Sequence, residues 1–129
     1  MTGKYLLDTN IVIALFAKDE NVLSQLKSAE EVFIPSIVLG ELYFGANKSG
    51  RSKSNIARIE EFAAKNQIIT IDGETARHYG QVKNDLRAKG KPIPENDIWI
   101  AALSRQHKYV LVTQDDHFSQ VDGIETIKW

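Results

Sequence analysis

Short apolar runs of β type alternate along the chain with segments whose apolar residues recur at helical spacing. The runs predict four strands and a short fifth one, at Lys4–Leu7, Val32–Ile34, Gln67–Ile71, Tyr109–Val112 and Ile124–Ile127. Two short helices are expected between the first two strands, beginning with Ile11–Phe16. Strands separated by helices form βαβ units, so the pattern predicts an α/β fold with a mainly parallel sheet flanked by helices.

The remaining helices are longer, and most have a recognisable boundary. Ser36, directly after Pro35, is expected to be the N-cap of one helix, and Asp72 the N-cap of another. Gly90 and Pro92 end that second helix. In order, the longer helices are predicted from Ser36 to about Asn47, over Ser54–Lys65, from Asp72 to Gly90 and over Asn96–His107.

The size and composition are those of one soluble domain, which we expect to span residues 1–129. The chain has no cysteine, which excludes disulfides, thiolate zinc sites and a cysteine nucleophile, and suits a reducing cytoplasm. A net charge of -1 argues against a protein that coats nucleic acid through charge alone. The apolar run Ile11–Ala17 is too short to cross a bilayer, so we expect a cytoplasmic protein without a membrane anchor.

Four of the 17 acidic residues have mainly apolar neighbours, which predicts partial burial. Each also has an ordinary structural explanation: a turn or helix cap for Asp8 and Asp115, a helix surface for Glu41, and a first-turn acid for Asp97. Asp116 lies beside Asp115 and leaves the choice between these two carboxylates open. In parallel α/β sheets, however, ligands bind beyond the carboxyl ends of the strands, where all four acids can meet.

Four carboxylates in a small volume repel one another and take up protons unless cations are present. Oxygen ligands alone favour magnesium or manganese over zinc. The histidines are poor candidates for catalysis, because His78, His107 and His117 lack the spacing of a metal-binding pair. Neighbouring polar side chains are candidates for orienting the carboxylates or water, with ordinary turn hydrogen bonding as the alternative: Thr9, Asn10, Thr113 and Asp116.

The acids lie within short ordered motifs, which are Leu7-Asp8-Thr9-Asn10, Gly40-Glu41-Leu42 with Gly45, the run Pro94–Ala102, and Val112-Thr113-Gln114-Asp115 with Phe118. Over essentially its whole length the chain therefore resembles the PIN-domain nucleases, and more narrowly the VapC-type toxins of toxin–antitoxin pairs. The family pattern Thr-x-Asp-x-x-Phe selects Asp115 over Asp116.

This resemblance implies a PIN-like three-layer α/β/α fold and an endoribonuclease that depends on Mg²⁺, with Mn²⁺ as a substitute. It implies Asp8, Glu41, Asp97 and Asp115 as the catalytic, metal-binding set; we expect Asp8 and Asp97 to bind the metal directly, and Glu41 and Asp115 to bind it directly or through water. It also implies a transfer RNA or ribosomal RNA substrate, a homodimer, and a cognate VapB-type antitoxin that inserts a basic side chain near the acids.

Arg87, Lys89 and Lys91 form a basic stretch before the Asp97 motif, and we expect them to contact RNA phosphates unless they are a plain solvated surface. Two other functions stay open. One is a PIN-fold DNA nuclease or non-catalytic nucleic-acid binding module. The other, more remote, is a phosphoacceptor receiver domain, which requires a phosphorylatable aspartate after the third strand where this chain has the expected helix cap Asp72.

Overall fold

The computed structural model describes residues 3–129, and in it five parallel strands form one sheet in the order β3-β2-β1-β4-β5. The strands are β1 (Lys4–Leu7), β2 (Glu31–Pro35), β3 (Gln67–Ile69), β4 (Val110–Val112) and β5 (Thr126–Ile127). The α-helices are α1 (Thr9–Phe16), α2 (Glu20–Ser28), α3 (Ser36–Asn47), α4 (Ser52–Ala64), α5 (Gly73–Lys89) and α6 (Glu95–His107), and a 3₁₀ helix, η1, spans Asp116–Gln120.

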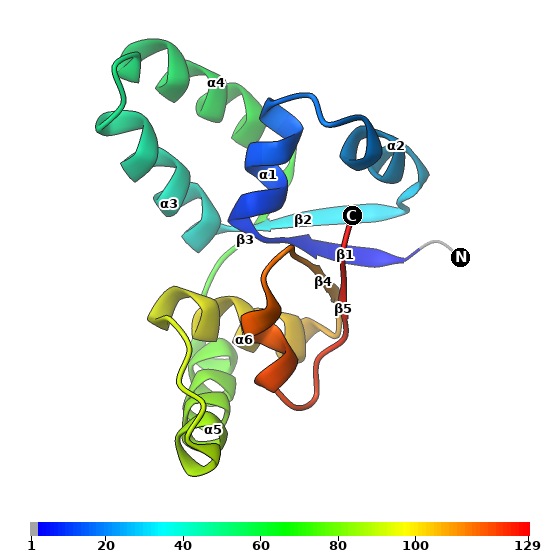
Figure 1. The fold of residues 1–129 in the computed structure, drawn as a ribbon, viewed down its shortest axis with the longest axis vertical. Helices are drawn as coiled ribbons and strands as arrows, with labels where there is room; N and C mark the ends of the chain where they lie inside the picture. The colour runs from blue at the N-terminus through cyan, green and yellow to red at the C-terminus, as the bar shows by residue number, and fades with distance from the viewer. Residues whose placement is uncertain (1–2) are drawn as a thin grey trace.

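Figure 1 shows the sheet between two helical layers, with α1 to α4 on one face and α5 and α6 on the other. The helical crossovers between parallel strands put helices on both faces. The prediction of an α/β fold with a parallel sheet flanked by helices is therefore confirmed.

The strand order reverses between β1 and β4. From β1 the chain runs outward through β2 to β3, and then returns through α5 and α6 to β4 on the other side of β1. Leu7, the last residue of β1, is in register with Val112, the last residue of β4. A reversal of this kind leaves a crevice beyond the carboxyl ends of the two strands, which is the usual ligand-binding place in such sheets.

The central strands hold the core. Leu6, Leu7, Ile34 and Val112 are almost completely buried, and apolar residues of the helices cover them from both faces. Because these strands are buried on both sides, they are continuous apolar runs in the sequence without polar alternation. The core thus fixes the positions of the strand ends from which the polar loops depart.

Several boundary predictions are wrong; the fifth strand, for example, begins at Thr126 and not at Ile124. Ser36 is not the N-cap of α3: Pro35, the last residue of β2, takes that position with extended backbone angles and makes no side-chain cap hydrogen bond. Ser36 is therefore already helical. The third strand ends at Ile69 and not at Ile71, because the chain leaves the sheet edge and Ile71 is 39% exposed.

The cap at Asp72 is confirmed. Its Oδ1 accepts a hydrogen bond from the backbone N–H of Thr75 at 3.0 Å, and the Thr75 hydroxyl accepts one from the Asp72 backbone. Gly90 ends α5 in the left-handed conformation, with φ at 67°, which glycine adopts without strain. No helix within residues 3–129 has the length and apolar character needed to cross a membrane.

Candidate active site

Asp8 lies at the reversal point of the sheet, directly after β1. Its backbone N–H donates to the carbonyl of Val112 at 3.0 Å, which extends the pairing of β1 and β4 by one residue. Its side chain is the N-cap of α1 and accepts from the Thr9 N–H at 2.8 Å. Asp8 is only 4% exposed. The cap and the candidate catalytic residue are therefore the same carboxylate.

Two further side chains hold the other oxygen of Asp8. The Thr113 hydroxyl donates to Oδ2 at 2.7 Å, and the Asn10 amide donates to it at 3.3 Å. Thr113 follows β4 and is itself buried, so its position is set by the sheet. Fixed donors on both oxygens leave the Asp8 carboxylate one orientation, as expected for the support of a metal ligand.

The loop after β4 places Asp115 toward the same crevice. Thr113 Oγ1 accepts from the backbone N–H of Asp115 at 3.0 Å, and Asn10 Oδ1 accepts from the backbone N–H of Gln114 at 3.2 Å. Asp116 points elsewhere: its side chain is 86% exposed and pairs with Lys128 at 3.0 Å. The structure thus separates the two adjacent acids, with Asp115 at the crevice.

Glu41 and Asp97 reach the crevice from opposite faces of the sheet. Glu41 lies in α3, in the second turn after β2, and Asp97 lies in the first turn of α6. Among the described residues, Oε1 of Glu41 is buried without a hydrogen-bond partner. Such an atom is costly unless another group satisfies it, and a cation in the crevice would do so.

All four acids line one cavity of about 550 Å³. The polar candidates Thr9 and Asn10 line it as well. Thr113 does not line it but donates a hydrogen bond to Asp8. We call this cavity the acidic pocket; its lining residues are Asp8, Thr9, Asn10, Ile13, Glu41, Pro94, Glu95, Asn96, Asp97, Asp115 and His117. Side chains up to 109 positions apart in the sequence therefore share one small volume.

The surroundings of the pocket disfavour the ionised form of three of its carboxyl groups. Burial raises the pKa of Asp8, and the charge of Asp115 raises it further, against the lowering effect of the hydrogen bonds from Thr113 and Thr9. Burial also raises the pKa of Glu41 and of Asp97, and in both the charge of Asp8 adds to the rise. Carboxylates in this state are stabilised by a bound cation.

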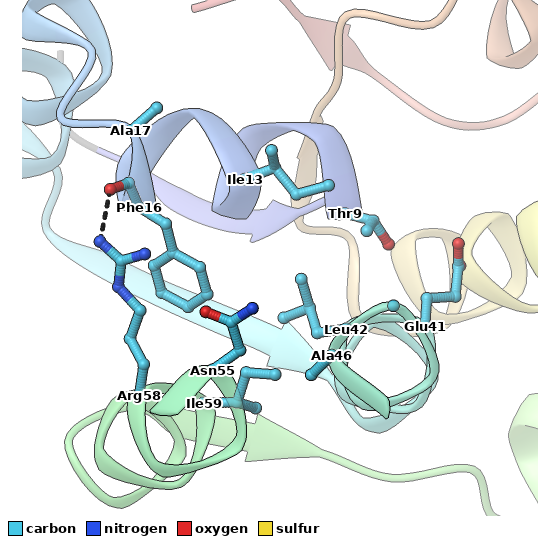
Figure 2. A pocket seen from close by; sticks show the side chains of 11 residues that line it. Thr9, Ile13, Phe16, Ala17, Glu41, Leu42, Ala46, Asn55, Arg58 and Ile59 are labelled. Atoms are coloured by element: carbon cyan, nitrogen blue, oxygen red, sulfur yellow. Dashed lines mark hydrogen bonds between the residues drawn. The ribbon is translucent and has the colours of Figure 1, made fainter. Parts of the chain in front are cut away.

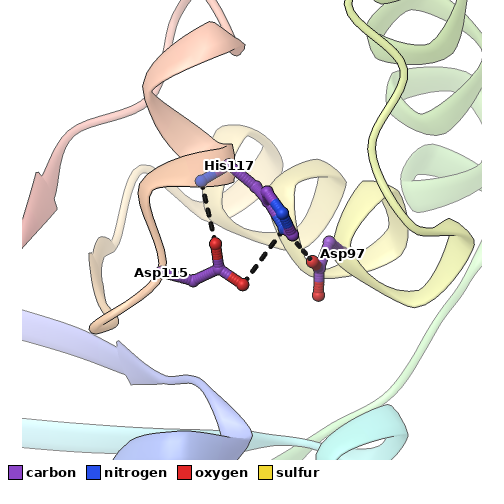
Figure 3. A group of neighbouring side chains, drawn as sticks. All are labelled: Asp97, Asp115 and His117. Atoms are coloured by element: carbon purple, nitrogen blue, oxygen red, sulfur yellow. Dashed lines mark hydrogen bonds and ion pairs between the residues drawn. The ribbon is translucent and has the colours of Figure 1, made fainter.

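The pocket also contains a histidine, which its spacing in the sequence made a poor candidate for catalysis. His117, in η1, lies between Asp115 and Asp97 (Figure 3). Its Nδ1 is 3.1 Å from Asp115 Oδ2 and 3.3 Å from Asp97 Oδ2. The search for paired histidine spacing misses it, because its partners are carboxylates from two other segments. The usable signal was its position two residues after Asp115, at the start of a short turn.

The basic stretch lies outside the acidic pocket. Lys89 pairs with Asp122 at 2.9 Å and donates to the carbonyl of Gln120 at 3.0 Å. Arg87 lines a separate hollow at the end of α5, and Lys91 is exposed. The contact of Arg87, Lys89 and Lys91 with RNA stays a prediction, and these residues lack a place beside the acids.

A second cavity, of about 380 Å³, adjoins the acidic pocket between α1, α3 and α4 (Figure 2). We call it the apolar pocket. It shares Thr9, Ile13 and Glu41 with the acidic pocket, and its other lining residues are Phe16, Ala17, Leu42, Gly45, Ala46, Asn55, Arg58 and Ile59. The Arg58 guanidinium at its far end donates to the carbonyl of Phe16 at 2.7 Å.

Comparison with known sequences gives one family. The PIN domain model matches residues 5–124. The chain is 39% identical over 129 residues to a protein named ribonuclease VapC2 of Haemophilus influenzae, with 98% of each chain covered. It is 33% identical to a protein named tRNA(fMet)-specific endonuclease VapC of Shigella flexneri, again over 98% of each chain.

Comparison with solved structures gives the same fold. A chain of DNA-bound VapBC from Salmonella typhimurium superposes with a TM-score of 0.91 at 31% identity, covering 100% of this chain and 99% of that one. A chain of VapBC2 from Rickettsia felis, bound to a DNA fragment from its promoter, gives a TM-score of 0.90 at 28% identity over 98% of each chain.

Proposed function

The chain belongs to the PIN domain family, and from this membership and the acidic pocket we propose that it is a metal-dependent endoribonuclease of the VapC type, the toxin of a toxin–antitoxin pair. The observation that carries the proposal is the meeting of Asp8, Glu41, Asp97 and Asp115 in one open cavity beyond the strand ends. Family membership without this arrangement would describe the fold alone.

The residues of the acidic pocket fit a divalent cation. The possible ligand atoms are mostly carboxylate oxygens. The pKa values of Asp8, Glu41 and Asp97 are raised by burial and by neighbouring carboxylates. Within residues 3–129, Oε1 of Glu41 is also buried without a hydrogen-bond partner. Oxygen donors suit Mg²⁺, with Mn²⁺ as a substitute. Asp8 and Asp97 would hold the ion directly, and Glu41 and Asp115 directly or through water.

The chain's own groups prepare the reaction. A divalent ion held by these residues would supply positive charge for the scissile phosphate and make the attacking water more acidic. Thr113, Asn10 and the Thr9 N–H fix the Asp8 carboxylate, so that it does not have to reorganise when RNA arrives. Asp115, 32% exposed, and Asp97, 14% exposed, lie nearer the mouth of the pocket, where a backbone phosphate can approach.

We propose RNA as the substrate because relatives over nearly the whole chain are named ribonucleases, and the one from Shigella flexneri is named for tRNA(fMet). A transfer RNA or a ribosomal RNA loop is the substrate class that we assign. The alternative of a DNA nuclease or a non-catalytic binding module predicts cleavage of DNA or of neither nucleic acid.

The partner that we assign is a VapB-type antitoxin, since structures similar in fold are VapBC complexes. The apolar pocket is continuous with the acidic pocket through Thr9, Ile13 and Glu41, so an apolar segment lying there could place a basic side chain beside the acids. The homodimer, the cytoplasmic location and a single domain over residues 1–129 remain part of this proposal.

The receiver-domain alternative is disfavoured by the position of Asp72. This residue follows β3 at the edge of the sheet, two strands away from β1, and its carboxylate is engaged in capping α5. It also accepts a hydrogen bond from Gln106 at 3.0 Å. An aspartate so engaged is poorly placed to receive a phosphoryl group beside Asp8.

The test compares RNA, single-stranded DNA and duplex DNA as substrates of the purified protein in Mg²⁺. RNA should be cut, and Asp8→Asn should reduce the rate more than about a hundredfold, since even supporting residues of metal sites contribute about 10- to 100-fold. Asp116→Asn is the matched control, because Asp116 is exposed and paired with Lys128 outside the pocket; it should leave the rate unchanged.

Equal rates for the parent and Asp8→Asn would overturn the assignment of the pocket, and preferential cleavage of DNA would overturn the substrate. Induced expression in cells, with mapping of new RNA ends, then identifies the RNA. Asp97→Asn serves there as the inactive control, and co-expression of the antitoxin should suppress the new ends.

A further inference from the structure

His117 bridges two acids that come from different parts of the fold. Asp97 belongs to the first turn of α6, and Asp115 to the loop after β4. The imidazole lies between them, with Nδ1 at 3.3 Å from Asp97 Oδ2 and 3.1 Å from Asp115 Oδ2 (Figure 3). The side chain is half exposed, so the contact lies at the mouth of the acidic pocket and not in the core.

The backbone fixes the ring in this place. Asp115 Oδ1 accepts a hydrogen bond from the backbone N–H of His117 at 2.9 Å, which closes a tight turn at the start of η1. Phe118, the next residue, is almost completely buried and anchors the turn in the core. The imidazole is thus held beside both carboxylates by elements that do not depend on the ring itself.

The distances suit the ligands of a single ion. One ligand atom from each of Asp97, Asp115 and His117 lies within 4.8 Å of the others. Adjacent ligands at right angles around an ion with bonds of about 2.1 Å are about 3 Å apart. The two separations from Nδ1 are close to this value, and a small movement of the side chains would bring all three atoms to one ion.

We propose that His117 is a nitrogen ligand which, with Asp97 and Asp115, holds a divalent ion at the mouth of the pocket and shifts the metal preference from Mg²⁺ toward first-row transition ions. The proposal rests on the proposed metal-dependent function and specifies its ion. Mg²⁺ takes oxygen ligands, whereas an imidazole nitrogen favours transition ions, with affinity rising from Mn²⁺ to Co²⁺.

The test measures the binding of Mg²⁺, Mn²⁺ and Co²⁺ to the full chain by calorimetry at one neutral pH, without RNA. His117→Ala should weaken Co²⁺ and Mn²⁺ binding about tenfold or more, and Mg²⁺ binding less than about threefold. The visible absorption of bound Co²⁺ should also change, because it reports the loss of a nitrogen ligand independently of any activity.

Two variants separate ligation from other roles. His117→Asn keeps a polar side chain that can hydrogen-bond to the carboxylates, and it should fail to restore the Co²⁺ affinity or spectrum. His107→Ala, at the other end of α6 and stacked on Tyr109, is the matched histidine control and should bind all three ions as the parent does. Restoration by asparagine would show that His117 only positions the acids, and would overturn the inference.

The outcomes also distinguish this inference from the proposed function. If the parent binds the ions and cuts RNA while His117→Ala keeps the parent's Co²⁺ affinity and spectrum, the ligand role is wrong and the nuclease stands. If the parent neither binds an ion nor cuts RNA with any of the three ions, the proposed function fails together with the inference.

Discussion

The two adjoining pockets share a wall and differ in chemistry. Asp8, Asp97 and Asp115 make the acidic pocket a place for cations, whereas Leu42, Ala46 and other apolar side chains line the apolar pocket. Thr9, Ile13 and Glu41 belong to both. A largely apolar molecule that fills the apolar pocket therefore lies close to the acids, although it carries no charge itself.

This contrast predicts that metal binding and antitoxin binding depend on different side chains. Asp8 is held by hydrogen bonds at the ends of β1 and β4. The apolar pocket is formed by three packed helices, which carry only Glu41 of the four pocket acids. Glu41, on α3, is the carboxylate at the border. The two pockets should then respond to different substitutions, and each of the following experiments changes one of them.

The largest effect is expected at Thr113, which supports only the acidic pocket. Thr113→Val keeps the shape but removes the hydroxyl that donates to Asp8 and accepts from the Asp115 N–H. Metal affinity and the cleavage rate should each fall about 10- to 100-fold, the usual cost of losing a group that supports a metal ligand. Calorimetry with Mg²⁺ and an RNA cleavage assay measure the two quantities.

Thr113→Ser is the control, because it restores the hydroxyl. It should recover most of the affinity and rate, whereas a merely structural role for Thr113 would make the serine and valine variants differ only in thermal stability. If Thr113→Val cleaves RNA as fast as the parent, the hydrogen bonds of Thr113 do not contribute to catalysis. That result would contradict the assignment of Thr113 to the support of the acidic pocket.

An intermediate effect is expected at Gly45, which lines only the apolar pocket. A Cβ at this position meets nothing within 4 Å, so Gly45→Leu should fold well. The leucine should fill space that, in our proposal, the antitoxin occupies. Overfilling a packed contact costs at least about 1 kcal/mol, so antitoxin affinity should fall at least about fivefold. RNA cleavage by the free protein should stay within about twofold.

Gly80→Leu is the matched control for that experiment. Gly80 is an exposed glycine of α5, also without neighbours for a Cβ, and lines neither pocket. It should leave both antitoxin affinity and cleavage unchanged. If Gly45→Leu binds the antitoxin as tightly as Gly80→Leu does, the apolar pocket is not the docking surface.

The smallest effect is a pH dependence that belongs to the acidic pocket alone. The pKa values of Asp8, Glu41 and Asp97 are raised in the folded protein, mainly by burial. Above about pH 4 these three groups therefore bind more protons in the folded state than in the unfolded state, and they lower stability as pH rises through their folded pKa values. Without metal, Tm should therefore rise as pH falls from neutral toward pH 5.

Two comparisons isolate this effect. The carboxylates with lowered pKa values, Glu61, Asp72 and Glu74, lose their contribution only as pH falls below their ordinary range, so they do not mask it near pH 5. Asp8→Asn should show a shallower rise, since one raised group is gone, and saturating Mg²⁺ should reverse the trend because it binds the deprotonated acids. A metal-free Tm that falls between pH 7 and pH 5 would contradict the prediction.

Local patterns allowed the elements and their order to be predicted from the sequence. Apolar runs marked the buried strands, and Asp72 and Gly90 marked the ends of α5, because these signals act between near neighbours along the chain. The exact ends of some elements could not be predicted in this way, because they depend on pairing within the sheet. Ser36 is helical because β2 ends at Pro35, and the third strand stops where the sheet edge gives it no further strand partner.

Residue types and their short spacings were enough to predict the parallel α/β fold and the four acids within their motifs. Which groups meet depends instead on long-range packing: Thr113 with Asp8 across 105 positions, His117 with Asp97 across 20, and Lys89 with Asp122 outside the pocket. These groups meet because the strand order reverses between β1 and β4, which brings distant segments to one crevice. The packed core fixes this strand order, and no short stretch of the sequence encodes it.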